Sequence, residues 1–63
     1  MNNEVTMASG EKWWIGDPEA DSLERDISDG TSRLRSLNAT RTHRGPVVIA
    51  KLNPRLVESV KLP

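Results

Sequence analysis

The sequence contains no cysteine, phenylalanine or tyrosine, and these absences remove several classes of protein. Without cysteine there is no disulfide and no thiolate ligand for zinc. His43 is the only histidine, so a zinc site would need carboxylates or a second chain to complete it. The sequence also has no glycine-rich phosphate loop. We therefore expect no metal, no cofactor and no small-molecule substrate.

Long apolar segments are also missing. No apolar run approaches the roughly 20 residues that a helix needs to cross a membrane. The first residues, MNNE, are polar and acidic and lack the basic and apolar regions of a secretory signal. We expect a cytoplasmic protein without membrane contact. Such a short chain buries only about 60% of its unfolded surface, which leaves little scope for a catalytic cleft, so we also expect that it is not an enzyme.

Charge is abundant and is sorted by position. Residues 1–32 carry eight acidic and two basic side chains, whereas residues 33–63 carry seven basic and one acidic side chain. The two halves therefore have formal charges of −6 and +6, although the net charge of the chain is zero. This sorting indicates either a charged partner or an electrostatic contact between the halves.

A single amphipathic helix is predicted over residues 18–37. Asp17 is suited to cap its N-terminus, and Pro18 suits the first helical position, where no backbone N–H is needed. With Gly30 in the one missing place, apolar residues repeat at spacings of three and four at Ala20, Leu23, Ile27, Leu34 and Leu37. The turn dipeptide Asp29-Gly30 favours the alternative of a broken helix, whose second part Thr31 would cap.

The remaining segments predict a small α+β domain over residues 13–63. The segment 47–52, VVIAKL, predicts a strand because β-branched residues suit a pleated sheet. Asn53-Pro54 stops this strand, and residues 54–62 then form either a second strand or a short helix. Residues 1–12 lack sustained periodicity and predict a mobile tail.

The apolar stripe and the tryptophan pair supply the candidate partner-binding residues. The stripe is either the buried face of a monomer or a face that meets a partner protein or a second copy. Adjacent strand residues point to opposite sides, so one tryptophan can be buried while the other is exposed as a binding hot spot. The candidates are Trp13, Trp14, Leu23, Ile27, Leu34 and Leu37.

The basic half offers an alternative. Arg33, Arg35, Arg41 and Arg44 would contact phosphates in an antitoxin-like or phage-like nucleic-acid-binding regulator. The pI of about 6.6 lies below the value above about 9 that is typical of a dedicated nucleic-acid domain. We therefore expect a small interaction or regulatory protein that binds a partner protein or self-associates through its amphipathic helix, with nucleic-acid binding as the alternative.

The segment 47–60, VVIAKLNPRLVESV, resembles the strand and the first-helix start of ribbon-helix-helix repressors and antitoxins. The resemblance implies a strand that pairs across a dimer and places side chains in the DNA major groove. The sequence departs from this family in two ways. Only Lys61, Leu62 and Pro63 follow where a second helix is required, and the predicted helix before the strand is foreign to the family's core.

Overall fold

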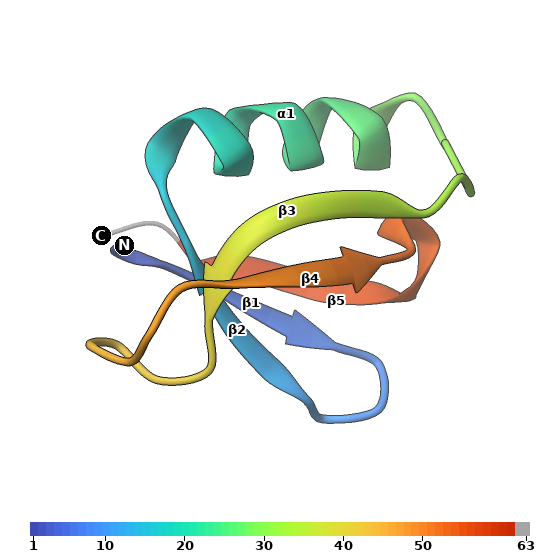
Figure 1. The fold of residues 1–63 in the computed structure, drawn as a ribbon. Coiled ribbons are helices and arrows are strands. Elements are labelled where there is room, and N and C mark those ends of the chain that lie inside the picture. The colour runs from blue at the N-terminus through green and yellow to red at the C-terminus, as the bar shows by residue number, and fades with distance from the viewer. Residues whose placement is uncertain (62–63) are drawn as a thin grey trace.

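The computed structural model describes residues 1–61, which form one helix packed on a five-stranded antiparallel sheet (Figure 1). The strands are β1 (Asn3–Met7), β2 (Lys12–Ile15), β3 (Arg35–Thr40), β4 (Val48–Leu52) and β5 (Val57–Lys61). The helix α1 (Asp17–Ser28) connects β2 to β3, and a 3₁₀ turn, η1 (Pro54–Leu56), precedes β5. The predicted α+β class is confirmed, with strands as the larger part.

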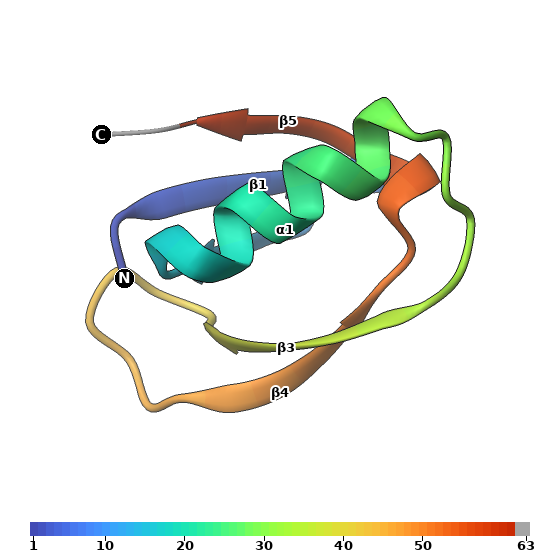
Figure 2. The ribbon, with the colours of Figure 1, turned by 90° about the horizontal axis from the view of Figure 1, so that it is seen from above.

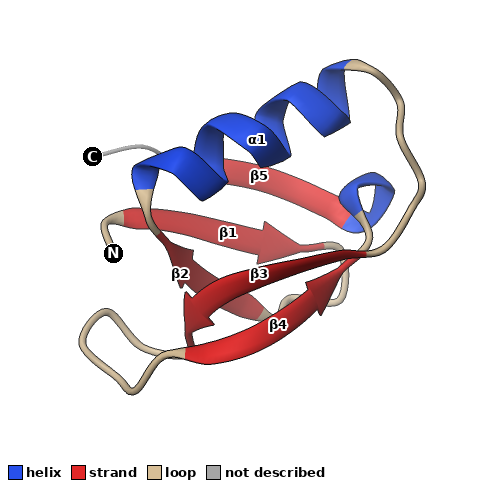
Figure 3. Cartoon of the chain, turned by 45° about the horizontal axis from the view of Figure 1, so that its top comes forward, coloured by secondary structure: helices blue, strands red, loops and turns tan. Residues whose placement is uncertain are grey.

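The strand order in the sheet is β4-β3-β2-β1-β5, and every neighbouring pair is antiparallel. The first and last strands of the chain therefore pair with each other, while β4 and β5 form the two edges. Seen from above, α1 crosses over β1 between β5 and β3 (Figure 2). The helix covers one face of the curved sheet (Figure 3).

The prediction of a mobile tail over residues 1–12 is not confirmed, because β1 lies inside the sheet. Asn3, Val5 and Met7 are buried, and the residues between them are half-buried. Such alternation is typical of a strand with one face in the core. A turn at Gly10, where φ is 91°, returns the chain into β2.

The helix begins one residue earlier than predicted. Its N-cap is Gly16, which makes no side-chain capping hydrogen bond, so the prediction of Asp17 as the cap is wrong. Asp17 Oδ1 instead accepts a 2.9 Å hydrogen bond from Nδ2 of the buried Asn3, which also donates to the Ile15 carbonyl. This contact fixes the start of α1 against the first strand.

The helix ends at Ser28, so the predicted continuous helix to residue 37 is not confirmed. The Gly30 N–H bonds to the Ile27 carbonyl and the Thr31 N–H bonds to the Asp26 carbonyl, with Gly30 at φ 71°. This is a Schellman motif, which suits glycine because a left-handed residue with a Cβ is strained. The alternative prediction, a helix broken at Asp29-Gly30, is correct about the break, but a strand follows it and not a second helix.

The hydrophobic core lies between α1 and the sheet. From α1 it takes only Ala20 and Leu23. The buried residues from the strands are Val5, Met7, Trp13, Ile15, Leu37, Ala39, Ala50 and Leu52. The predicted stripe is therefore divided, since Leu37 enters the core from β3 and Leu34 lies in the loop before it.

The predicted strand at 47–52 is confirmed as β4, with its start at Val48. After it, both alternatives occur in sequence. The Asn53 side chain accepts a hydrogen bond from the Arg55 N–H and caps η1, and β5 then follows. Residues 57–61 form a strand where the ribbon-helix-helix resemblance implied a helix, and the predicted end at residue 62 lies outside the described residues.

Candidate interaction surface

The predicted partner-binding residues do not form one surface. Trp13, Leu23 and Leu37 are buried in the core, with exposed fractions of 7%, 0% and 5%. Ile27 and Leu34 are exposed, but they line different hollows, one beside η1 and the other beside the end of β4. Only exposed side chains are accessible to a partner, so Trp13, Leu23 and Leu37 act in folding.

The tryptophan pair is split between the faces of β2, as adjacent strand residues must be. Trp14 is half-buried on the face opposite the core, and its ring lies 4.7 Å from the ring of His43 between centroids. His43 Nε2 also lies 3.3 Å from Asn2 Oδ1. The loop between β3 and β4 is thereby attached to the N-terminal residues.

Trp13 is enclosed by an ion pair. Its Nε1–H donates a 3.0 Å hydrogen bond to Glu11, and the Arg41 guanidinium carbon lies 4.1 Å above its ring. Arg41 also bonds Glu11 at 2.8 Å, and this contact, together with the Trp13 hydrogen bond, lowers the pKa of the Glu11 carboxyl. Arg41, a candidate phosphate contact, is therefore already bound to a carboxylate.

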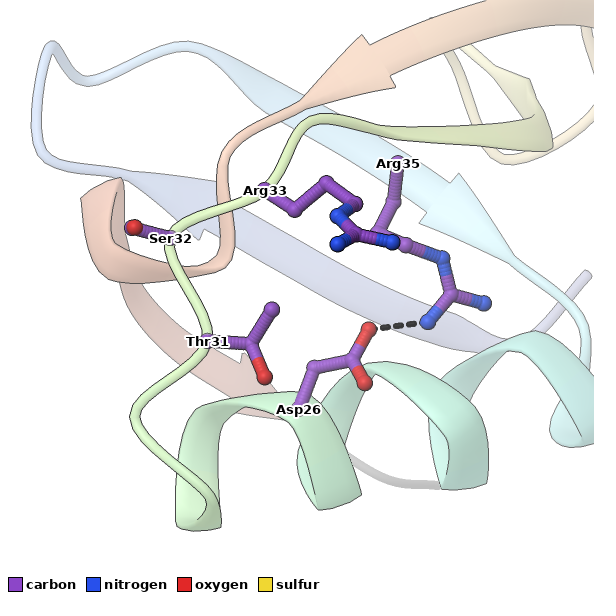
Figure 4. A pocket seen from close by; sticks show the side chains of 5 residues that line it. All are labelled: Asp26, Thr31, Ser32, Arg33 and Arg35. Carbon is purple, nitrogen blue, oxygen red and sulfur yellow. Dashed lines mark hydrogen bonds and ion pairs between the residues drawn. The ribbon is translucent and has the colours of Figure 1, made fainter.

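Arg35 is engaged in a similar way on the helix side. Its guanidinium forms an ion pair with Asp26 on α1 (Figure 4). It also donates a 2.7 Å hydrogen bond to Ser22 Oγ on the same helix. Arg33 extends beside Arg35 into the same polar hollow of about 620 Å³. The sequence predicted either a charged partner or an electrostatic contact between the two halves. The ion pair between Arg35 on β3 and Asp26 on α1 is a contact of the second kind.

The four basic candidates are divided between two places. Arg33 and Arg35 lie near the end of α1, whereas Arg41 and Arg44 lie at the opposite end of β3, in or beside the loop that leads to β4. Arg35 and Arg41 already contact the carboxylates of Asp26 and Glu11. The structure does not bring the four together as one phosphate-binding surface.

The fold converts the sorted charge into charged layers. The exposed acids Asp17, Asp21, Glu24 and Asp29 lie on or directly after α1. From residue 30 to residue 57 the sequence contains no acid, and this stretch includes β3 and β4. Its bases are Arg33, Arg35, Arg41, Arg44, Lys51 and Arg55. Of these bases, Arg44, Lys51 and Arg55 lie on or beside β4, so this edge is basic, whereas the exposed side of the helix is mainly acidic.

The edge strand β4 and the residue before it carry the most continuous exposed apolar segment of the described chain. Val47, Val48 and Ile49 have exposed fractions of 59%, 41% and 65%. The pairing of β4 with β3 is regular over five residue pairs, and the other side of β4 has no strand neighbour. An edge of this kind presents unpaired backbone groups, which proteins usually protect with charges or bulges.

The opposite edge shows such protection. β5 carries Glu58 and Lys61, and its register with β1 shifts between Thr6 and Met7. In β4 the only charged residue is Lys51. The sequence predicts this strand but not its exposed edge, because strand order is set by pairing between distant segments. The sequence signal for an exposed edge was the aliphatic run Val47–Ile49, followed in the same strand by a single charged residue, Lys51.

Among residues 1–61, no group of three histidine or acidic side chains is placed to hold a metal ion. None of the helices in the described part of the chain is long and apolar enough to cross a membrane. No match to this chain emerges from comparison with protein-family models, with curated proteins or with solved structures.

Proposed function

We propose that this chain is a small interaction protein that binds an extended, acidic segment of a partner protein as an added strand on the edge of β4. The observation that carries the proposal is the exposed aliphatic run Val47–Ile49 at the start of an edge strand whose only charged residue is Lys51. In strand addition, backbone hydrogen bonds supply affinity, and alternate side chains supply specificity. An added strand would also cover the exposed aliphatic side chains.

The charge around β4 supports an acidic partner. Arg44 precedes the strand, Lys51 lies on it and Arg55 follows it, and residues 30–57 contain no acid to oppose them. In an antiparallel pair of two copies, the loop before β4 of one copy would lie beside the segment after β4 of the other. Self-association here would bring like charges together, whereas an acidic strand would be attracted.

This proposal retains a non-enzymatic interaction protein but moves the binding surface. The helix stripe is not used, because Leu23 lies in the core beneath α1 and Leu37 enters the core from β3. The exposed edge replaces the helix as the surface for a partner.

The test uses a synthetic peptide, TLEVTVEE, whose binding is measured by fluorescence anisotropy at low and moderate salt. We expect binding that weakens as salt rises, because exposed charges are screened. Ile49→Glu should weaken binding at least about tenfold, since it removes an apolar contact and repels the acidic peptide. Ser59→Glu is the matched control, because it adds the same charge to the exposed edge strand on the other side of the sheet.

Amide hydrogen exchange separates strand addition from simple charge attraction. We expect peptide binding to slow exchange of those β4 amides that point away from β3. No binding at millimolar peptide, equal weakening by both variants, or unchanged β4 exchange would refute the proposal. A dimer of the free chain that Ile49→Glu dissolves, seen by sedimentation equilibrium, would assign the edge to a second copy and also refute it.

Nucleic-acid binding is the second candidate, and the acid-free stretch from residue 30 to residue 57 is the observation that favours it. The contacts of Arg35 and Arg41 with Asp26 and Glu11 favour the protein partner. A short DNA duplex that binds with steep salt dependence and is released by Arg44→Ala would support nucleic-acid binding. Competition between that duplex and the peptide would place both ligands on the same side of the sheet.

A further inference from the structure

We infer that a groove at the C-terminal end of β4 selects the partner segment by accepting a large aliphatic side chain at that segment's N-terminal end. This inference rests on the proposed function, since the groove is taken to act together with the β4 edge. The groove has a volume of about 370 Å³. It lies between the β1–β2 turn, the residue before β3 and the connection from β4 to η1.

Part of the groove lining is aliphatic, and the rest includes the charged side chains of Glu11 and Lys51. Met7 and Leu52 are buried residues of the core that reach it, while Leu34 and Leu56 stand at it with exposed fractions of 63% and 55%. Two leucines so exposed, beside two buried apolar side chains, offer a surface that gains stability when another apolar group covers it. The part of the groove that these four residues form therefore suits an aliphatic side chain.

The groove adjoins the C-terminal end of β4, because Lys51 and Leu52 belong to this strand and also line the groove. The Ala8 N–H bonds to the Leu56 carbonyl at 2.7 Å, which holds the two walls of the groove together. In the inferred complex, the partner segment pairs along the edge of β4 and its N-terminal residues reach the groove.

The geometry also sets the direction of the segment. All four pairings in the sheet are antiparallel, and antiparallel pairing is the slightly more stable form. An antiparallel segment has its N-terminal end beside Leu52 and its C-terminal end beside Val47 and the Arg44 loop. The expected pattern is an aliphatic residue first, an acid opposite Lys51, and further acids at the end near Arg44.

The experiment is a double-mutant cycle between the chain and the peptide TLEVTVEE, in which leucine is placed beside Leu52. Replacing the peptide's leucine by alanine (TAEVTVEE) should weaken binding to the wild-type chain about tenfold, because a large aliphatic contact is lost. For the Leu34→Ala variant the two peptides should bind within about twofold of each other. Ile27→Ala is the matched control, since Ile27 is an exposed aliphatic residue that does not line this groove.

Direction is tested with the reversed peptide, EEVTVELT, which should bind about tenfold more weakly. Far-UV circular dichroism checks that Leu34→Ala, at an exposed position, leaves the fold intact. Equal binding of the leucine and alanine peptides to the wild-type chain would refute the role of the groove, but it would not contradict strand addition on β4. Failure of every peptide would overturn the proposed function itself. A tenfold preference for leucine that persists in Leu34→Ala and in Leu56→Ala would also refute the groove.

Discussion

Leu23 should supply most of the apolar packing between α1 and the sheet. Leu23→Ala should therefore remove a large share of the unfolding free energy. A chain of this length is expected to have a total unfolding free energy of about 3–9 kcal/mol, at about 0.05–0.15 kcal/mol per residue. Leu23 is fully buried, and the only other buried residue of α1 is Ala20. A buried leucine replaced by alanine costs about 3 kcal/mol or more through lost transfer energy and a cavity.

Ile27 provides the comparison, because the sequence pattern placed it on the same apolar stripe. Its exposed fraction is 39%, so Ile27→Ala should cost about 1 kcal/mol or less, and alanine is the better helix former. Urea unfolding followed by tryptophan fluorescence measures both variants, with Trp13 in the core as the reporter. Equal losses for Leu23→Ala and Ile27→Ala would refute the docking of α1 described here.

Two further predictions concern the end of the helix and the pair beside Trp13. Gly30→Ala should lower the unfolding free energy by about 1 kcal/mol, because Gly30 has φ 71°, where a residue with a Cβ is strained. The space beside Gly30 is open, so the added methyl group meets no other atoms. An unchanged urea midpoint would contradict this prediction. The carboxyl of Glu11 should titrate with a pKa below its ordinary value of 4.5, and Arg41→Gln should raise that pKa, as followed by NMR. A carboxyl whose pKa is lowered by folding stabilises the fold above its unfolded pKa, and this contribution is lost as pH falls through the lowered value. Identical Glu11 titrations in both proteins would show that Arg41 does not set this pKa.

Local signals identified the start of the helix but not its end. Asp17-Pro18 marks the first turn through the chemistry of one or two residues, and the helix begins there. The stripe beyond Gly30 was misleading, because Leu37 has helical spacing to Leu23 yet lies in β3. The spacing of apolar residues shows neither which of them are buried, since Leu34 is exposed, nor which element buries the others.

The strands depend on pairing between segments that lie far apart in the sequence, so no short segment predicts how they pair. Residues 3–7 alternate correctly for a strand, but only Val5 and Thr6 favour β-structure, and the strand exists because β2 and β5 pair with it on both sides. The candidate surface has the same origin. The residues Val47–Ile49 were recognised as strand-forming, while their exposure follows from the position of β4 at the edge of the sheet.

The pairing of β1 with β5 has a consequence for how the chain acquires its structure during synthesis. Val5 pairs with Val60, so β1 is synthesised well before the strand that covers one of its sides. Contacts between such distant segments require closing a long loop, which slows folding. Until β5 arrives, one side of β1 is an open strand edge, and the nascent chain is most prone to pair with the wrong strand during that interval.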